Sequence, residues 1–382
     1  MLQHAAYLQQ LGHECHIFLE DEFGIEDASK RIKNLFGYDF KNAFYGWTKS
    51  TDANIAIATI WYSAIFVRDL PYACKKVYFV QDYEAYFNPM GDSFLLAENS
   101  YSYGLIPITI GRWLRHELKT RFNVDGYHFE FGANTKIYHP LPAKVKTEKS
   151  ICFIYQPEKP RRCAQLGLEA LGIVKYRMPD VKIYLYGSNS KGNIWFEHEN
   201  LGLLDLNACN ALYNKCSAGL CISSSNPSRI PFEMMAAGLP VVEIWRENNL
   251  YDFPENAVTL CQQNAESLAQ GIIDILKDEN KAERMGTAGS SFMQGRSLEM
   301  EMQQFSLALN SIINDEPLIV QSIEKKYLSV PNKIAINYDV PSEYKAVNIV
   351  AQRNPKLKTL AAMLPSPLRS FLRKLYFAVN KG

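Results

Sequence analysis

The stretch Ser224 to Asn249, SSNPSRIPFEMMAAGLPVVEIWRENN, reads as a loop, a short helix, a tight turn and a buried strand. Its first residues are turn formers, and Ser228 suits the N-cap of a helix that holds Pro231 in its first turn. Gly238 is expected to end that helix, because glycine takes the left-handed conformation at no steric cost. A strand follows from Val241. The pattern therefore predicts a strand–helix–strand corner of an α/β protein.

The start of this helix suits an anionic ligand. In open α/β sheets, ligands bind at the carboxyl ends of the strands, and free N–H groups at a helix N-terminus attract phosphate. The carboxylate of Glu233, one turn into the helix, can accept hydrogen bonds from sugar hydroxyls. Together these parts suit a nucleotide diphosphate. The alternative is an ordinary corner of the sheet that binds nothing.

The run PFEMMAAGLPVV, positions 231–242, resembles the donor-site helix of GT-B glycosyltransferases of glycosyltransferase family four. The longer run SNPSRIPFEMMAAGLPVV resembles a subgroup of bacterial rhamnosyltransferases that build cell-surface glycans. The family pattern has two glutamates; Glu233 matches the second, and Ser225 occupies the position of the first. The resemblance implies an α/β protein of GT-B fold, with two Rossmann-like domains that face each other across a cleft.

Composition is that of a globular protein with room for two domains. The chain has 382 residues and a net charge of +1, which favours neither nucleic acid nor membrane as a partner. The cysteines are scattered without a CxxC pair and are expected to be reduced thiols of a cytoplasmic protein. They are Cys15, Cys74, Cys152, Cys163, Cys209, Cys216, Cys221 and Cys261. Neither a signal peptide nor an apolar run of membrane-spanning length is expected.

Strand-like and helical patterns alternate along the chain, which predicts parallel sheets with helices on both faces. The expected ranges are 1–140 for an N-terminal acceptor-side domain, 141–150 for a linker, 151–295 for a nucleotide-sugar-binding domain, 296–314 for a crossover helix and 315–382 for a tail. The first domain begins with a helical pattern from Leu2 to Leu11, so its first strand and a glycine-rich turn are apparently missing. The alternatives are a truncated chain, a start codon placed too late, or a domain that lacks this strand.

Polar residues follow the strand-like run KVYFV. Gln81, Asp82, Tyr83 and Glu84 resemble an acceptor-side segment of the rhamnosyltransferase-like subgroup, in which Asp82 would be catalytic. The alternative is a solvated turn. Asn134 lies in FGANTKIYHP, a run similar to a family loop that lines the cleft, and is also expected on the acceptor side.

The loop QPEKPRR offers cations for a leaving diphosphate, because the guanidinium group matches phosphate oxygens. Arg161, with Glu233, is expected to be catalytic. The residues expected to bind the donor are Arg161, Arg162, Gly187, Ser188, Leu203, Leu204, Ser224, Ser225, Asn226, Ser228, Arg229 and Glu233. A solvated basic turn is the alternative for the arginine pair.

The resemblance implies a glycosyltransferase that moves a sugar, rhamnose from dTDP-rhamnose, onto a growing cell-surface polysaccharide with retention. The sequence has no DxD motif, so neither a metal ion nor a cofactor is expected; cations and helix dipoles would replace Mg²⁺ at the phosphates. One alternative is a catalytically inactive GT-B-like subunit of a glycan assembly complex. Another, which lacks the expected acid–base residues, is a nucleotide-sugar 2-epimerase.

The end of the chain carries an amphipathic pattern at 366–379, SPLRSFLRKLYFAV. Such a helix suits an anionic membrane surface and suits equally a docking site on the protein itself. The expected localisation is cytoplasmic, with a peripheral position at the inner face of the plasma membrane if this helix binds lipid.

Overall fold

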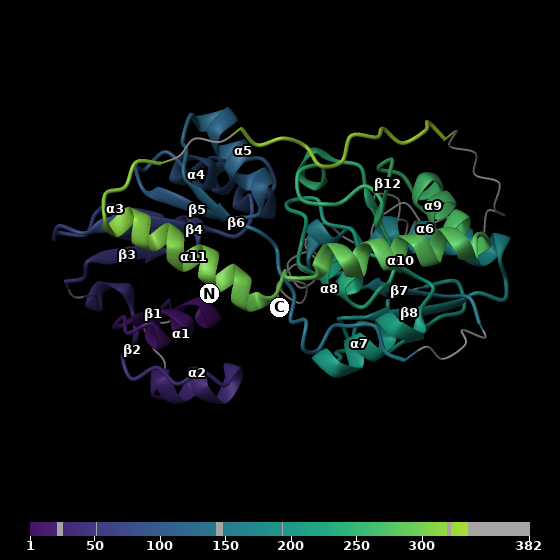
Figure 1. Ribbon diagram of the computed structural model, residues 1–382, viewed down its shortest axis with the longest axis horizontal. Helices are drawn as coiled ribbons and strands as arrows, with labels where there is room; N and C mark the ends of the chain where they lie inside the picture. Colours follow the sequence, from purple (N-terminus) through teal and green to yellow (C-terminus); the bar gives the residue numbers. More distant parts are fainter. Residues whose placement is uncertain (21–25, 51, 143–147, 193, 319–321, 335–382) are drawn as a thin grey trace, which may run out of the picture. The chain divides into compact units, whose positions relative to one another are not determined.

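Two groups of parallel strands make up the computed structural model, which describes the chain except residues 21–25, 51, 143–147, 193, 319–321 and 335–382 (Figure 1). We call Met1–Phe129 the first lobe and Ser150–Met293 the second lobe. The predicted α/β class with parallel sheets is confirmed. The predicted domain boundaries themselves stay predictions.

The first lobe holds a four-stranded parallel sheet in the order β3-β4-β5-β6 and a separate parallel pair, β1-β2. The strands are β1 (Ile17–Leu19), β2 (Ala43–Tyr45), β3 (Ile55–Ala58), β4 (Lys75–Val80), β5 (Ile106–Ile110) and β6 (Tyr127–Phe129). The helices are α1 (Leu2–Gln10), α2 (Ala28–Phe36), α3 (Trp61–Arg68), α4 (Asp92–Ser100) and α5 (Arg112–Phe122), with short 3₁₀ turns η1 (Trp47–Lys49) and η2 (Glu84–Phe87).

The helix expected from Leu2 is confirmed as α1. The strand expected at 14–19 is shorter and begins at Ile17. Its pair with β2 stands apart from the sheet that begins at β3.

The second lobe is a six-stranded parallel sheet in the order β12-β11-β10-β7-β8-β9. The strands are β7 (Ser150–Ile154), β8 (Lys182–Tyr186), β9 (Glu199–Asn200), β10 (Ala218–Leu220), β11 (Val241–Ile244) and β12 (Val258–Cys261). The helices are α6 (Ala164–Arg177), α7 (Leu206–Lys215), α8 (Ile230–Ala236), α9 (Ala265–Lys277) and α10 (Glu279–Met293), with turns η3 (Pro160–Arg162) and η4 (Glu247–Asn249).

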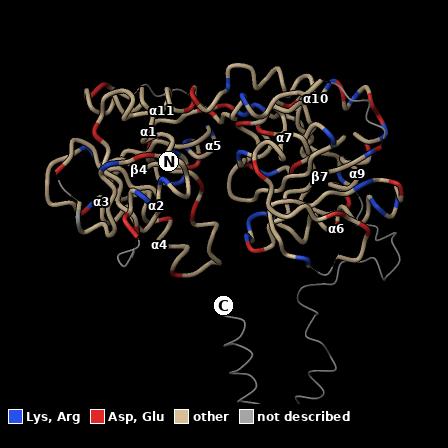
Figure 2. The backbone as a smooth tube through the Cα atoms, turned by 90° about the horizontal axis from the view of Figure 1, so that it is seen from below, with Lys and Arg blue, Asp and Glu red and all other residues tan. Residues whose placement is uncertain are grey.

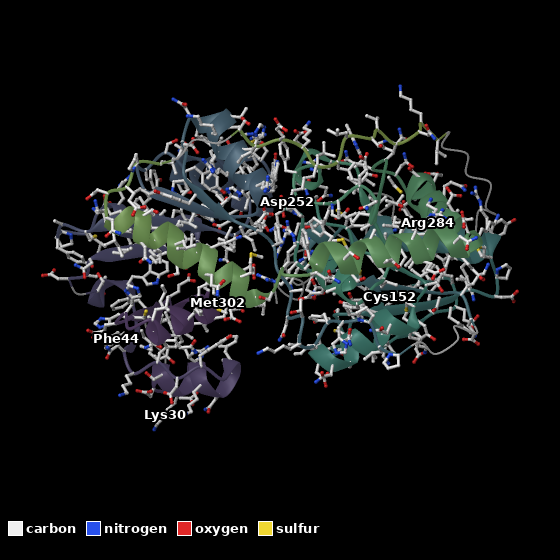
Figure 3. The ribbon with its side chains drawn as sticks, in the orientation of Figure 1. Lys30, Phe44, Cys152, Asp252, Arg284 and Met302 are labelled. Atoms are coloured by element: carbon white, nitrogen blue, oxygen red, sulfur yellow. The ribbon has the colours of Figure 1, made fainter. Side chains whose placement is uncertain are left out.

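Inner strands of this sheet are buried on both faces, so their sequences are apolar without alternation. Every residue of β7 is buried, and Cys152 lies at its centre (Figure 3). The predicted stop of α8 is confirmed: Gly238 takes a positive φ of 74°, and its N–H donates to the carbonyl of Met235 at 2.9 Å. These features place the carboxyl end of β10 and the start of α8 on a rigid support.

Helix α11 (Leu298–Ile313) lies in the range predicted for the crossover helix; it follows the second lobe and packs on β6 of the first lobe. The chain then returns to the second lobe, as the yellow-green segment of Figure 1 shows. There the backbone N–H groups of Lys326 and Tyr327 donate to the carbonyl of Leu250 at 2.8 and 2.9 Å. The predicted amphipathic helix at 366–379 lies outside the described residues. No helix within the described ranges is both long and apolar enough to cross a membrane.

Candidate functional site

The segments that follow β4 and β10 meet across the two lobes. The side-chain amide of Asn226 donates to the carbonyl of Gln81 at 2.9 Å. The Nε of Arg161 lies 3.9 Å from Oδ2 of Asp82. Both contacts join residues that lie directly beyond the carboxyl ends of parallel strands, where open α/β sheets bind ligands. Residues predicted from separate motifs are thus neighbours in the structure.

We call Ser223–Ser228 the serine loop. The N–H of Ser228 donates to Oδ1 of Asn226 at 2.8 Å, and Ser228 adopts a positive φ of 64°. The prediction of Ser228 as the N-cap is wrong by one residue, because Arg229 is the N-cap and makes no side-chain capping bond. The left-handed turn at Ser228 moves the helix start forward along the chain. Pro231 lies in the first turn of α8, as predicted.

The two predicted phosphate-binding arginines lie in η3 and reach in different directions. The guanidinium of Arg161 stacks 4.5 Å from the ring centre of Phe87, which belongs to the first lobe. The Nη1 of Arg162 donates to Oγ of Ser228 at 2.7 Å, which ties η3 to the serine loop. The carbonyl of Arg161 also accepts from the N–H of Ser224 at 3.1 Å. The arginines and the loop therefore form one hydrogen-bonded unit.

Three buried polar atoms here have no hydrogen-bond partner within the described part of the chain: Oδ1 of Asp82, Oγ of Ser225 and Nε of Arg162. Buried polar atoms are normally satisfied, so such a group marks a place where a polar ligand can bind. Burial raises the pKa of Asp82 to about 6, against the opposing charges of the Arg161 and Arg162 guanidinium groups. Asp82 is therefore mainly ionised at neutral pH and can accept a proton.

Glu233 lies in the first turn of α8, as predicted. Burial raises the pKa of Glu233 to about 7, while Arg229 and a hydrogen bond from the hydroxyl of Tyr138 favour its ionised form. The side chain of Arg229, expected at the donor, is bonded to the carbonyl of Gly132 and to Glu301 of α11. Arg229 therefore holds α8 against the first lobe and the crossover helix.

The remaining predicted donor residues come together at the end of β8. The N–H of Gly187 donates to the carbonyl of Gly202 at 2.8 Å, which brings the Gly187–Ser188 turn next to the loop of Leu203 and Leu204. Gly187 has a positive φ of 98°, so a larger residue would be strained there. Leu203 is 71% exposed and Leu204 is partly buried.

The predicted acceptor-side segment is only partly accessible. Tyr83 and Glu84 are buried in the first lobe, where Oε2 of Glu84 accepts from the N–H of Trp61 at 2.6 Å. Their side chains bond within the first lobe, where the hydroxyl of Tyr83 donates to Glu98 at 2.6 Å. The carbonyl of Asn134 accepts from the N–H of Tyr138 at 2.7 Å and closes the turn that delivers Tyr138 to Glu233.

Several residues at the site carried no strong signal in the sequence. Arg246 donates from Nε to the carbonyl of Ser224 at 3.1 Å, and Glu243 of β11 accepts from the N–H of Ser223 at 2.6 Å. A glutamate inside the apolar run VVEI was the available signal for Glu243. Tyr138 and Glu301 could not be placed, because their partners lie far away in the sequence. Among the residues that the structure describes, no three His, Cys, Asp or Glu side chains gather as a metal site.

Residues 149–273 match the family model described as the C-terminal domain of WsaF. The chain is also 30% identical over 262 residues to the O-antigen biosynthesis protein RfbC of Myxococcus xanthus. That match covers 66% of this chain and 20% of the relative, so the chain spans about a fifth of the relative's length. The family match covers most of the second lobe, including η3, the serine loop and Glu233.

Solved structures extend the likeness to both lobes. HepE of Anabaena, solved in complex with UDP, has a TM-score of 0.60 at 13% identity, covering 78% of this chain and all of that one, 100%. Sucrose-phosphate synthase of Thermosynechococcus elongatus has a TM-score of 0.59 at 15% identity, covering 82% of this chain and 92% of that one. The chain has the GT-B fold. In this GT-B fold, the serine loop and η3 follow strands of the second lobe and meet the Gln81–Asp82 segment of the first.

Proposed function

We propose that this GT-B protein is a glycosyltransferase that transfers a sugar from a nucleotide-sugar donor onto a growing cell-surface glycan. The observation that carries the proposal is the convergence of Asp82, Arg161, Arg162 and Ser225, with three buried polar atoms unpartnered in the described structure. The match to the WsaF C-terminal domain and to an O-antigen biosynthesis protein supports this reaction class.

The donor diphosphate would lie against η3 and the serine loop. The guanidinium groups of Arg161 and Arg162 neutralise the charge that develops as the diphosphate leaves, and the Ser225 hydroxyl adds a neutral donor. Both arginines are partly buried, so their charges are less screened than they would be in water. Glu233 accepts hydrogen bonds from the hydroxyl groups of the sugar or ribose.

The acceptor would approach from the side of Gln81 and Asp82. An acceptor hydroxyl oxygen forms the new bond to the anomeric carbon on the face from which the diphosphate leaves, and the bond from that carbon to the diphosphate oxygen breaks. The hydroxyl proton passes to Asp82, which lies beside Arg161. The pKa of about 6 suits this role, because a base works best when its pKa lies near the working pH.

The finer features of the proposal come from the resemblance in positions 225–242. They are dTDP-rhamnose as the donor and retention at the anomeric carbon. Independence of a metal ion is proposed because the sequence has no DxD motif. Peripheral contact with the inner face of the plasma membrane belongs to the same proposal.

Lys, Arg, Asp and Glu are interspersed over the described chain in Figure 2, in agreement with the net charge of +1.

A second candidate is a catalytically inactive GT-B-like subunit of a glycan assembly complex. It is favoured by Ser225 at the position where the family pattern places a carboxylate, and by the divided sheet of the first lobe. A subunit of this kind would fold normally but would not bind a nucleotide, and this separates the two candidates by experiment.

The deciding experiment is a thermal-shift panel with dTDP, UDP, GDP, ADP and CMP on the wild type, Arg161→Ala and Arg284→Ala. A ligand that binds only the folded state raises the melting midpoint by mass action. We expect dTDP to stabilise the wild type and Arg284→Ala, whose substituted residue lies on α10 (Figure 3), and to lose its effect in Arg161→Ala. A preference for UDP or GDP would change the donor, and no shift with any nucleotide would favour the inactive subunit.

A further inference from the structure

A buried acid lies directly beneath the serine loop. Glu243 is in β11, and its side chain is 0% exposed. Glutamate is almost never buried to this degree unless its carboxyl group is paired. Here both carboxyl oxygens accept backbone N–H groups, Oε1 from Ser223 at 2.6 Å and Oε2 from Ile244. The side chain is therefore fixed to the point where the serine loop begins.

The hydrogen bonds around Ser223 show what this fixing achieves. Strands β10 and β11 pair through Leu220 and Val242, and the N–H of Cys221 still donates to the carbonyl of Val242 at 3.1 Å. Beyond Cys221, side chains replace the backbone hydrogen bonds of the sheet. The carboxyl group of Glu243 accepts from the N–H of Ser223, as described above. The chain from Ser223 onward is thus released from the sheet without leaving that buried group unpaired.

Two asparagines complete the arrangement. The side-chain amide of Asn248 donates to the carbonyl of Ser223 at 3.1 Å, and that of Asn249 donates to the carbonyl of Ile244 at 2.9 Å. Both asparagines are buried. We call Glu243, Asn248 and Asn249 the loop anchor. Glu243 accepts from the N–H of Ser223 and Asn248 donates to its carbonyl, so both backbone polar groups of Ser223 are paired. The loop anchor bends the chain toward η3 and the first lobe.

We propose that the loop anchor is the positioning element of the donor site, with Glu243 as its principal residue. By fixing Ser223, it presents the Ser225 hydroxyl and, through Ser224, the arginines of η3 to the donor diphosphate. This inference rests on the proposed function and deepens it. The loop anchor contacts the serine loop at Ser223, and we place it outside direct contact with the donor.

The loop anchor also explains how the site tolerates Ser225. A carboxyl group contacts this loop from β11 even though a hydroxyl occupies the position where the family pattern has a glutamate. Burial raises the pKa of Glu243 well above its usual range, which favours the neutral form of the group. The surface that faces the diphosphate therefore keeps the positive charge of Arg161 and Arg162 without an opposing carboxylate on the loop.

The test uses Glu243→Gln, Glu243→Leu and a control, Glu266→Leu. Glutamine keeps an oxygen that can accept from Ser223, whereas leucine does not. Glu266 is a buried carboxyl group of the same lobe, in α9. The dissociation constant of the nucleotide diphosphate that stabilises the wild type is measured by calorimetry on the full chain. The donor KM and kcat are measured separately.

We expect Glu243→Leu to weaken nucleotide binding at least tenfold, or about 1.4 kcal/mol, and to raise KM more than it lowers kcat. Glu243→Gln should bind within about threefold of the wild type. Glu266→Leu should lower the melting midpoint without changing the affinity. If Glu243 had a merely structural role, Glu243→Leu would behave as Glu266→Leu does: its melting midpoint would fall and its affinity for the nucleotide would not change.

If Glu243→Leu does not fold, Asn248→Ala is the milder variant, because it keeps Glu243 in place and removes the contacts of the Asn248 amide to the carbonyl of Ser223 and to Oδ1 of Asn249. A loss of affinity of about threefold or more in Asn248→Ala would then support the proposal. Wild-type affinity in the folded Glu243→Leu or Asn248→Ala variant would overturn it. A wild type that binds no nucleotide at all would overturn the proposed function first, so the two failures are distinguishable.

Discussion

At the scale of single residues, the site is marked by carboxyl groups that burial makes reluctant to ionise. Burial raises the pKa of Asp82 to about 6 and those of Glu84 and Glu233 to about 7. Such shifts gather at functional sites because catalysis requires groups that exchange protons near neutral pH. Of these three, Glu84 is enclosed in the first lobe, so its titration affects the stability of the protein.

The pH dependence of Glu84 gives a direct prediction. Its carboxyl group binds a proton in the folded state up to about pH 7, whereas in the unfolded chain it releases that proton near the ordinary glutamate pKa of 4.5. The free energy of unfolding therefore falls as pH rises through this window, and stays lower above it. In Glu84→Gln this loss is absent. The advantage of the variant over the wild type should grow by about 2 kcal/mol between pH 5.5 and pH 8.5.

Chemical unfolding of both proteins at the two pH values measures this difference, and other titrating groups cancel because they are common to both. Glu283→Gln, at an exposed position of α10, is the control and should show a constant difference. A Glu84→Gln advantage that does not change with pH would contradict the assignment of the shift to burial of this group.

At the scale of elements, α8 depends on a close approach of α10. A Cβ atom at Gly286 would lie 2.4 Å from the carbonyl oxygen of Gly238, the residue that ends α8. A side chain at this point would push α10 away from the turn between α8 and β11. The position of α8, which carries Glu233, thus depends on Gly286 of α10 as well as on Gly238 at its own end.

Gly286→Ala should therefore destabilise the protein by about 1–3 kcal/mol, the usual cost of overpacking, although alanine favours helices more than glycine does. Thr287→Ala, at an exposed position of the same helix, should change the stability by less than about 0.5 kcal/mol. Urea unfolding of the two variants measures both effects. Equal urea midpoints for Gly286→Ala and the wild type would show that α8 and α10 can move apart without a loss of stability.

At the scale of the whole described unit, contacts far apart in sequence tie the lobes together. Oδ1 of Asp252 accepts from the N–H of Arg112 at 2.8 Å, and Asp252 lies where the two lobes meet (Figure 3). The carboxylate of Glu130 forms ion pairs with Arg112, Arg296 and Lys326. Lys326 belongs to the segment that returns from α11 to the second lobe. This segment therefore contributes to the stability of the lobe arrangement.

Tyr327 is the residue by which this returning segment is anchored. Its side chain is 7% exposed, and its hydroxyl accepts from the N–H of Leu260 at 3.2 Å. Tyr327→Ala leaves a cavity and an unpaired N–H, which should cost about 3 kcal/mol and lower the melting midpoint by several degrees. Leu328→Ala, at a residue 73% exposed, should leave it unchanged. Equal midpoints for the two variants in a calorimetric scan would show that the segment is not anchored there.

The sequence by itself determined the features that depend on neighbours along the chain. The turn formers, Pro231, Gly238 and the apolar run from Val241 predicted the strand–helix–strand corner, and the structure confirms where α8 ends. Alternating patterns predicted parallel sheets for the same reason, because periodicity and turn chemistry act within a few residues. The error at Ser228 arose because this residue takes the left-handed conformation, which composition does not reveal and which delays the helix start.

The tertiary structure alone decided which of these pieces meet. Asp82 and Arg161 are brought within 3.9 Å by the two lobes, and no local pattern encodes that distance. Sheet order places β11 beside β10, and this puts the carboxyl group of Glu243 under Ser223. Packing likewise gives Asp82 and Glu84 different partners, although only one residue lies between them: Asp82 lies beside Arg161 of the second lobe, and Glu84 accepts from the N–H of Trp61 in the first. Strand order and burial are properties of the packed chain, because each depends on contacts between residues far apart in the sequence.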